Sequence, residues 1–258
     1  MRICRFSVGG GEVAFGVVEG EGSDAHVTAI KGHPFGPFEL STARFPAAEV
    51  RLLAPVLPSK VVAIGKNYAE HAREMGSEPP AEPVVFLKPS TSVIGPGDPI
   101  PYPALSNEVH HEAELAVVIG RLCREVPVER AAEVVLGYTA ANDVTARDLQ
   151  RSDGQWTRAK GFDGFCPLGP WIVTDLDASD VAIRCSVNGV VRQDARTSDL
   201  MRGVPELISY VSAVMTLLPG DVVLTGTPAG VGPLEVGDSV SVTIEGIGSL
   251  TNPVVGRG

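Results

Sequence analysis

The amino-acid sequence predicts a β-rich α+β fold: a mixed sheet with few helices, preceded by a small β-rich N-terminal unit. Three observations support this class. The 258 residues include 29 glycines and 21 prolines, which favour many turns and short strands over a helical bundle. Short apolar runs of strand length recur along the chain. Strand and helix patterns do not alternate regularly, which argues against a doubly wound sheet or a barrel of βα units.

The N-terminal unit is expected to span residues 1–55, and the main domain residues 56–258. Met1–Phe6 and Val13–Val18 have the pattern of two strands, and the glycines at 9–11 indicate a hairpin turn between them. A third short strand is expected around Val27. Leu53–Pro58 contains two closely spaced prolines, which discourage a helix and indicate a connector.

The main domain is expected to contain several short strands and three helices. The strands are predicted at Val61–Ile64, Pro83–Lys88, His111–Ile119, Val222–Leu224 and Ser239–Ile244. The helices are predicted at Ala69–Met75, Val128–Leu136 and Val204–Leu218. The third helix has the clearest helical period, and Pro219 and Gly220 are expected to end it.

Charge and composition exclude several classes of protein. The formal net charge of −10 argues against nucleic acid as a partner, because phosphate binding needs a basic surface. No apolar run approaches the roughly 20 residues of a membrane span, and the first residues lack the pattern of a signal peptide. The four cysteines have no paired spacing, which predicts reduced thiols in a cytoplasmic protein and no disulfide framework or zinc site.

The segment from His110 to Ile119 carries the strongest chemical signal. In a strand, side chains at i and i+2 point to the same face, so Glu112 and Glu114 project together. Two adjacent carboxylates repel each other unless a cation lies between them, and oxygen ligands favour Mg²⁺ or Mn²⁺ over zinc. The alternative is an exposed edge strand with two solvated glutamates. His110 and His111 are interpreted as structural residues or as residues that contact the metal ligands, and not as ligands themselves, because the proposed ligands are all oxygens.

Asp143 is a third acidic candidate, since it follows a strand-like run. Its alternative interpretation is a helix N-cap. The neighbouring Arg147 and Asp148 are expected to form a structural ion pair or a capping interaction. If residues 69–75 are helical, His71 and Glu74 share a face, and a carboxylate bonded to an imidazole makes a general base. Pairing on the protein surface is the other interpretation of these two residues.

Two further segments could contact a substrate. Lys160 lies in a loop-like stretch from Gln155 to Asp163, where it could contact a substrate carboxylate or simply be solvated. Gly226–Gly232 contains three glycines, which let the backbone approach a ligand, and Thr227 offers a hydroxyl. The spacing does not match a phosphate-binding loop, so a nucleotide site is not supported.

Several of these segments occur in an order that resembles the fumarylacetoacetate hydrolase family. They cover roughly residues 58–255, and the short first region resembles that of the smaller bacterial members. The segments are Gly65-Lys66-Asn67-Tyr68, Phe86-Leu87-Lys88-Pro89-Ser90, His111-Glu112-Ala113-Glu114-Leu115, Asn142–Asp148, Lys160-Gly161-Phe162-Asp163, Pro219-Gly220-Asp221 and Thr225–Gly232.

The resemblance implies a mixed β-sandwich roll, a homodimer and a divalent ion, Mg²⁺ or Mn²⁺. The metal ligands would be Glu112, Glu114 and Asp143. The catalytic residues would be His71 and Glu74, which match a dyad on a lid, together with Lys160. The substrate-binding residues would be Lys66, Asn67, Tyr68, Gln155 and Thr227. Many relatives carry arginine at position 66, so the lysine loses bidentate recognition of a carboxylate.

The expected reaction breaks a C–C bond in a small 1,3-dicarbonyl or keto acid through a metal-stabilised enolate. It would be either hydrolysis of an acylpyruvate, with His71 activating water, or decarboxylation of oxaloacetate. The alternative is isomerisation of 2-hydroxyhepta-2,4-diene-1,7-dioate, a product of aromatic-ring breakdown. A third interpretation, a non-catalytic protein that binds a small acid, predicts a damaged set of site residues, and the sequence keeps that set.

Overall fold

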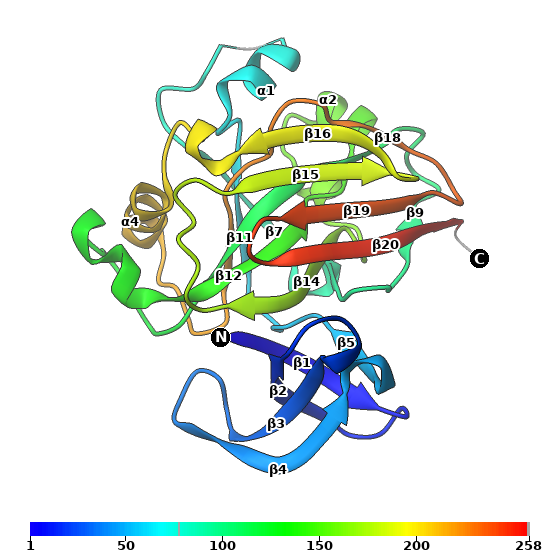
Figure 1. Cartoon of the computed structure of the whole chain (residues 1–258). Helices are drawn as coiled ribbons and strands as arrows, with labels where there is room; N and C mark the ends of the chain where they lie inside the picture. The colour runs from blue at the N-terminus through cyan, green and yellow to red at the C-terminus, as the bar shows by residue number, and fades with distance from the viewer. Residues whose placement is uncertain (77, 257–258) are drawn as a thin grey trace.

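The computed structural model describes residues 1–76 and 78–256, and strands dominate it (Figure 1). The largest sheet follows the order β4-β3-β2-β1-β14-β12-β11-β17-β6-β7, with β5 beside β1 and β8 beside β14. A second sheet has the order β16-β15-β19-β20-β9, and β10 pairs with β13 and β18 in a third. The predicted β-rich α+β class is confirmed.

The N-terminal strands form one end of the large sheet. They are β1 (Arg2–Val8), β2 (Val13–Glu19), β3 (His26–Gly32), β4 (Phe38–Pro46) and β5 (Val50–Leu53). The predicted hairpin is confirmed, since β1 and β2 pair in antiparallel register. The sequence did not indicate β4, because most of its residues are exposed and show no apolar alternation. β1 also pairs with β14, so one sheet continues across the expected domain boundary, which stays a prediction.

The centre of the large sheet positions the site described below. It contains β6 (Val61–Gly65), β7 (Val84–Lys88), β11 (Ala113–Ile119), β12 (Val135–Asn142), β14 (Cys166–Val173) and β17 (Val222–Leu224). Every residue of β11 is buried, since β12 and β17 flank it and the second sheet packs near it. The strands predicted in β6, β7, β11 and β17 are confirmed.

The second sheet packs against the large one, and apolar side chains from both form a common core. Its strands are β9 (Ile100–Tyr102), β15 (Ala182–Val187), β16 (Val190–Arg196), β19 (Ser239–Ile244) and β20 (Gly248–Gly256). The sequence did not indicate β20, because Asn252 occupies one of its inward positions and interrupts the apolar alternation. The short strands are β8 (Val93–Ile94), β10 (Val109–His111), β13 (Thr145–Ala146) and β18 (Gly232–Leu234).

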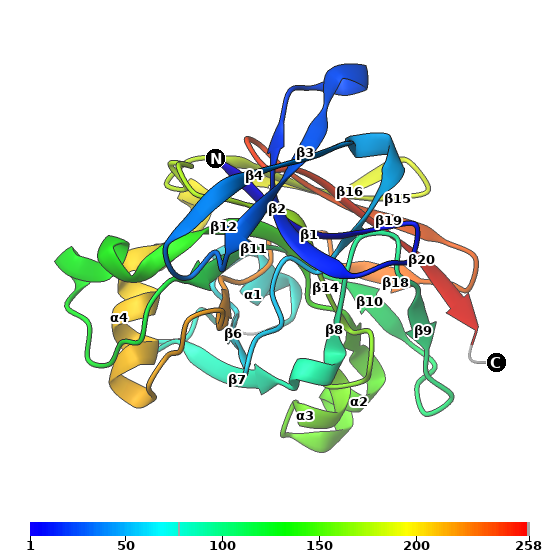
Figure 2. The ribbon, with the colours of Figure 1, turned by 90° about the horizontal axis from the view of Figure 1, so that it is seen from below.

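Four α-helices lie among the described residues. They are α1 (Ala69–Glu74), α2 (Arg147–Asp153), α3 (Thr157–Lys160) and α4 (Val204–Val214). α1 was predicted, whereas α2 and α3, which lie side by side near β7 in Figure 2, were not. None of the described helices has the length and apolar character needed to cross a membrane.

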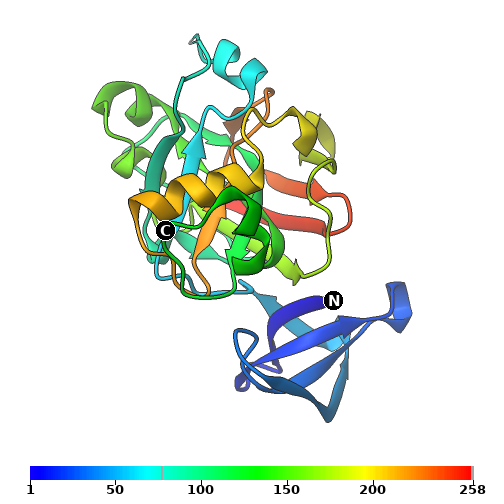
Figure 3. The same cartoon turned by 90° about the vertical axis from the view of Figure 1, so that its left-hand side faces the viewer.

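Two helix predictions require correction. The helix expected at 128–136 is a 3₁₀ helix, η4 (Val128–Val134), because Val135 already belongs to β12 and pairs with β11. The helix expected at 204–218 ends at Val214, since Leu217 forms a β-bridge with Cys123. η4 and α4 contact each other and appear in green and gold in Figure 3. The remaining 3₁₀ turns are η1 (Gly22–Asp24), η2 (Ala47–Glu49), η3 (Ser90–Ser92) and η5 (Thr197–Asp199).

Candidate active site

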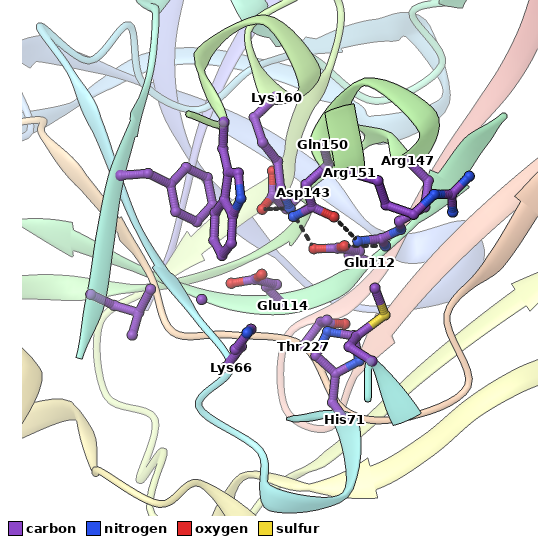
Figure 4. A pocket seen from close by; sticks show the side chains of 15 residues that line it. Lys66, His71, Glu112, Glu114, Asp143, Arg147, Gln150, Arg151, Lys160 and Thr227 are labelled. Carbon is purple, nitrogen blue, oxygen red and sulfur yellow. Dashed lines mark hydrogen bonds and ion pairs between the residues drawn. The ribbon is translucent and has the colours of Figure 1, made fainter. Parts of the chain in front are cut away.

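A cavity of about 160 Å³ opens where the centre of the large sheet meets α1, α2 and α3. Its walls combine segments that are far apart in the sequence (Figure 4). The lining includes Lys66, His71, Glu112, Glu114, Asp143, Arg147, Gln150, Trp156, Lys160 and Thr227. Most of these side chains are polar or charged, which suits a small hydrophilic ligand.

Three carboxylates form the floor of the cavity, and we call Glu112, Glu114 and Asp143 the carboxylate cluster. One oxygen of each lies within 4.8 Å of the others, and all three residues are at most 3% exposed. Asp143 N–H donates to the carbonyl of Glu112, at 2.8 Å, so the backbone joins their two segments. The exposed edge strand is therefore excluded for the glutamates. The N-cap interpretation of Asp143 is also wrong, because α2 begins only at Arg147.

Three buried cations neutralise two members of the cluster. Lys160 Nζ donates to Glu112 Oε2 at 2.7 Å and to Asp143 Oδ2 at 2.6 Å. Lys88 Nζ donates to Asp143 Oδ1, and Arg147 Nη2 donates to Glu112 Oε1, each at 2.5 Å. Buried ionic groups of this kind need such partners, because the loss of hydration is costly. The solvated alternative for Lys160 is thus wrong.

Glu114 differs from the other two carboxylates. It accepts a hydrogen bond from Gly226 N–H at 2.6 Å, and it has no ion pair with any described residue. Burial, and then the charges of Asp143 and Glu112, raise its pKa well above the ordinary value. Burial also opposes ionisation of Glu112, yet Lys160 and Arg147 lower the pKa of that group. Glu114 is therefore the carboxylate whose charge still needs a cation.

The cluster fits a hard divalent ion. It offers only oxygen ligands, it is close enough for one ion to reach all three groups, and one member lacks a positive partner. Gly226 enables the contact to Glu114. Its φ of +105° favours glycine, and a Cβ there would meet Asn67 Cβ at 2.8 Å.

The opposite wall is built by α1. His71 Nδ1 lies 3.0 Å from Glu74 Oε2, and Gly230 N–H donates to Glu74 Oε1 at 3.0 Å. His71 is buried and lines the cavity, on the side of Lys66 in Figure 4. The predicted contact between His71 and Glu74 is confirmed. The alternative of a surface pair holds for Glu74, which is exposed, but not for His71, which is buried.

Comparison with known proteins identifies the family. Residues 60–255 match the fumarylacetoacetate (FAA) hydrolase C-terminal family, and residues 1–55 match a family described as Rv2993c-like, N-terminal. The chain belongs to the fumarylacetoacetate hydrolase family. The family members found among its relatives include enzymes, namely hydrolases, an oxaloacetate decarboxylase and isomerases.

Individual relatives cover most or all of the chain. Protein Rv2993c of Mycobacterium tuberculosis is 58% identical over 100% of this chain and 99% of its own length. A mitochondrial oxaloacetate decarboxylase of Dictyostelium discoideum is 44% identical over 73% of this chain and 89% of its own length.

Solved structures have the same fold. The structure of 5-carboxymethyl-2-hydroxymuconate delta-isomerase from Mycobacterium smegmatis is 60% identical, covers 100% of both chains and has a TM-score of 0.94. Fumarylpyruvate hydrolase from Pseudomonas aeruginosa, in complex with Mn²⁺ and pyruvate, is 38% identical over 80% of this chain and 92% of its own, with a TM-score of 0.74.

The substrate-binding residues that the family resemblance implied fall into two groups. Lys66 and Thr227 line the cavity. Lys66 has a φ of +57°, a backbone conformation that is costly for a lysine and is often found at functional sites. Asn67 does not line the cavity: its amide donates to the carbonyls of Arg202 and Thr225, which holds the loops behind the wall.

Tyr68 and Gln155 also lie outside the cavity lining. Tyr68 lines a separate pocket on the other side of α1, and its hydroxyl is buried without a hydrogen-bond partner. Gln155 is exposed, whereas its neighbours Gln150 and Trp156 line the cavity. A substrate contact for Tyr68 or Gln155 stays a prediction that this geometry does not favour.

Sequence reasoning missed two of the buried cations. Arg147 was assigned to a pair with Asp148, but Asp148 instead accepts hydrogen bonds from Ser106 Oγ and Asn107 N–H. Lys88 was predicted as the end of a strand and was part of one segment of the family resemblance, but no role in the site was assigned to it. The signal that could have found it is its place at the inner end of an apolar run next to Pro89, where a solvated lysine is unusual. The interpretation of His111 as structural agrees with its burial and its contact with Gln193.

Proposed function

We propose that this protein is a divalent-metal-dependent enzyme that cleaves a C–C bond in a small keto acid, by decarboxylation of oxaloacetate or hydrolysis of an acylpyruvate. One observation carries the proposal: the buried carboxylate cluster, with its unpaired Glu114, faces the His71–Glu74 pair across a single cavity. Glu112, Glu114 and Asp143 would hold Mg²⁺ or Mn²⁺.

The charges around the cavity favour an anionic substrate. Lys88, Lys160 and Arg147 are paired with Glu112 and Asp143 only, but their three positive charges equal the three negative charges of the cluster in number, so these six groups carry no formal net charge when all are ionised. A divalent ion would leave this centre positive, and Lys66 adds a further cation at the wall. A substrate with one or two carboxylates would restore neutrality in a site where unpaired charge is costly.

The protein side chains would supply the remaining chemistry. When bound, the ion would act as a Lewis acid toward the keto and carboxylate oxygens of the substrate. For hydrolysis, Glu74 would orient His71, which would remove a proton from water as the water attacks the distal carbonyl. The C–C bond would break, its electron pair would stay on the keto-acid fragment, and a proton would later return to that carbon. Decarboxylation would need no water attack, so His71 would matter less.

A second candidate is isomerisation of 2-hydroxyhepta-2,4-diene-1,7-dioate. It draws support from the similarity to the 5-carboxymethyl-2-hydroxymuconate delta-isomerase structure, which covers the whole chain. The decarboxylase and hydrolase relatives support cleavage, and the presence of the His71–Glu74 pair favours it. A homodimer, a cytoplasmic location and the choice between Mg²⁺ and Mn²⁺ stay part of this proposal.

One experiment separates the candidates. The Mn²⁺-loaded protein is incubated with oxaloacetate, acetylpyruvate and 2-hydroxyhepta-2,4-diene-1,7-dioate, and each is followed by NMR with and without EDTA. Cleavage of either keto acid that EDTA abolishes would support the proposal and show which bond is preferred. Shifted double bonds with every carbon retained would support the isomerase. No turnover despite bound metal would contradict both and favour a non-catalytic protein that binds small acids.

A further inference from the structure

Gln193 lies behind the cavity and is the one buried residue of β16, all of whose other residues are partly or fully exposed. The strand turns it inward through an irregularity. Gln193 pairs with Cys185 and Val191 pairs with Ser186, which leaves Arg192 as an extra residue. A β-bulge of this kind re-aims a side chain, and bulges are common next to active sites.

The backbone fixes which end of the Gln193 amide faces which neighbour. Ala113 N–H lies 3.0 Å from Oε1 and can only donate, while the carbonyl of Pro228 lies 2.8 Å from Nε2 and can only accept. If the amide were turned over, its nitrogen would face the Ala113 N–H, donor against donor, and its oxygen would face the Pro228 carbonyl, acceptor against acceptor. The amide oxygen therefore points to Ala113, and the amide nitrogen points to Pro228.

This orientation determines the role of the Thr227 hydroxyl. Gln193 Nε2 also lies 2.8 Å from Thr227 Oγ1, and it can only donate. Thr227 Oγ1 is thus the acceptor in this bond, and its own hydrogen must point elsewhere. No other partner of this hydroxyl occurs in the described part of the chain, and Thr227 lines the cavity. The O–H is therefore available to a ligand in the cavity.

We infer that Gln193 is a positioning residue that makes Thr227 a hydrogen-bond donor toward the substrate. The inference rests on the proposed function, because an anionic keto acid presents only acceptors to this wall. Gln193 also joins the two halves of the site. Its oxygen binds the strand that carries Glu114, and its nitrogen binds the loop whose Gly226 N–H contacts the same carboxylate.

A double-mutant cycle tests this inference. Gln193→Glu keeps an oxygen that accepts from Ala113 N–H, but it replaces the amide nitrogen beside Thr227 with a second acceptor oxygen. The Thr227 hydroxyl should then donate to the new carboxylate instead of pointing its hydrogen into the cavity. Thr227→Val removes the hydroxyl. Each single variant should weaken pyruvate binding to the Mn²⁺-loaded protein by about tenfold, and raise KM for the preferred keto acid more than it lowers kcat. The double variant should lose no more than Thr227→Val alone.

Two controls separate positioning from folding. Val191→Glu adds the same charge to an exposed position of the same strand and should leave binding unchanged. Thr227→Ser keeps the hydroxyl and should retain most of the affinity. Additive losses in the cycle, or unchanged pyruvate binding in a folded Gln193→Glu variant, would overturn the inference.

A neutron diffraction map of the deuterated wild-type protein shows where the hydrogen on Thr227 Oγ1 points. This measurement requires no turnover and no variant protein. Deuterium on Thr227 Oγ1 that points into the cavity would support the inference. Deuterium on the line from Oγ1 to Gln193 would overturn it. If the wild-type protein converts no keto acid, the proposed function fails, while the map and the pyruvate titration still decide the role of Gln193.

Discussion

The floor and the α1 wall of the cavity are built very differently. On the floor, Glu112 and Asp143 each contact two buried cations, and both carboxylates are nearly inaccessible to solvent. The wall is a six-residue helix, and its Glu74, whose side chain is 34% exposed, contacts His71 and one backbone N–H of the loop after β17. A helix this short depends on tertiary contacts for its stability.

This difference separates two tasks. The floor is fixed by many mutually dependent charges, so it suits the step that every candidate reaction shares, the stabilisation of negative charge on a keto acid. The wall has few contacts and carries the one histidine of the cavity lining among the described residues, so it suits the step in which the reactions differ. The predictions below test that division.

The largest effect is expected for Glu114→Gln. Losing this carboxylate should abolish tight Mn²⁺ binding and lower turnover by about 10³-fold, because the site loses preorganised negative charge for the ion. The metal-free variant should stay folded, since a neutral amide avoids both the burial of a charge and the repulsion from Asp143 and Glu112, which together raise the pKa of Glu114. Calorimetric Mn²⁺ titration, a turnover assay and a thermal melt measure these effects.

Glu133→Gln, in an exposed pair with Arg130, is the matched control. Full activity in Glu114→Gln would show that the ligand set is wrong.

Lys160→Met should destabilise the floor. Its removal leaves Glu112 and Asp143 with less compensation in a buried site, where breaking an ion pair costs about 3–5 kcal/mol. The free energy of unfolding of the metal-free protein, measured with urea, should fall by that amount, and saturating Mn²⁺ should restore part of it. Lys31→Met, at an exposed position of β3, should change little. An unchanged unfolding free energy would mean that the floor is not held by these charges.

His71→Asn is the variant that most directly separates wall from floor. Hydrolysis of acetylpyruvate should fall by about 100-fold or more, because the general base is lost. Decarboxylation of oxaloacetate and Mn²⁺ affinity should change far less. Steady-state assays of both substrates measure the ratio, and Glu70→Gln, an exposed residue of the same helix, is the control. Equal losses for both substrates would contradict the division of tasks.

The sequence predicted the floor and the wall unequally. Glu112 and Glu114 followed from the two-residue period of a strand, and His71 and Glu74 from the geometry of a helix, because both patterns are local. Asp143 was a third acidic candidate from its place after a strand-like run, with a helix N-cap as the alternative, and only the family resemblance implied that it is a metal ligand. Lys88, Arg147 and Gln193 were not assigned to the site, since each is placed by partners at least 35 residues away in the chain.

The same limit explains the errors in the fold. The period in residues 204–218 is helical throughout, yet α4 ends at Val214 because Leu217 pairs with Cys123, a partner that no local pattern reveals. β20 was missed because its inward-facing Asn252 hydrogen-bonds to the carbonyls of Gly95 and Asp98. Local periodicity identifies elements, whereas long-range pairing determines where they end and which polar side chains are buried.

The smallest effect is expected for Lys66→Asn. Asparagine tolerates the left-handed backbone at this position better than lysine does, so the melting temperature should not fall. The lost cation should raise KM for oxaloacetate by no more than about fivefold, because a partly exposed ion pair contributes about 1 kcal/mol or less. kcat should stay close to the wild-type value, as measured by steady-state assays at several salt concentrations. A large fall in kcat would contradict this prediction. It would mean that Lys66, like the residues of the floor, acts on the reacting atoms of the substrate.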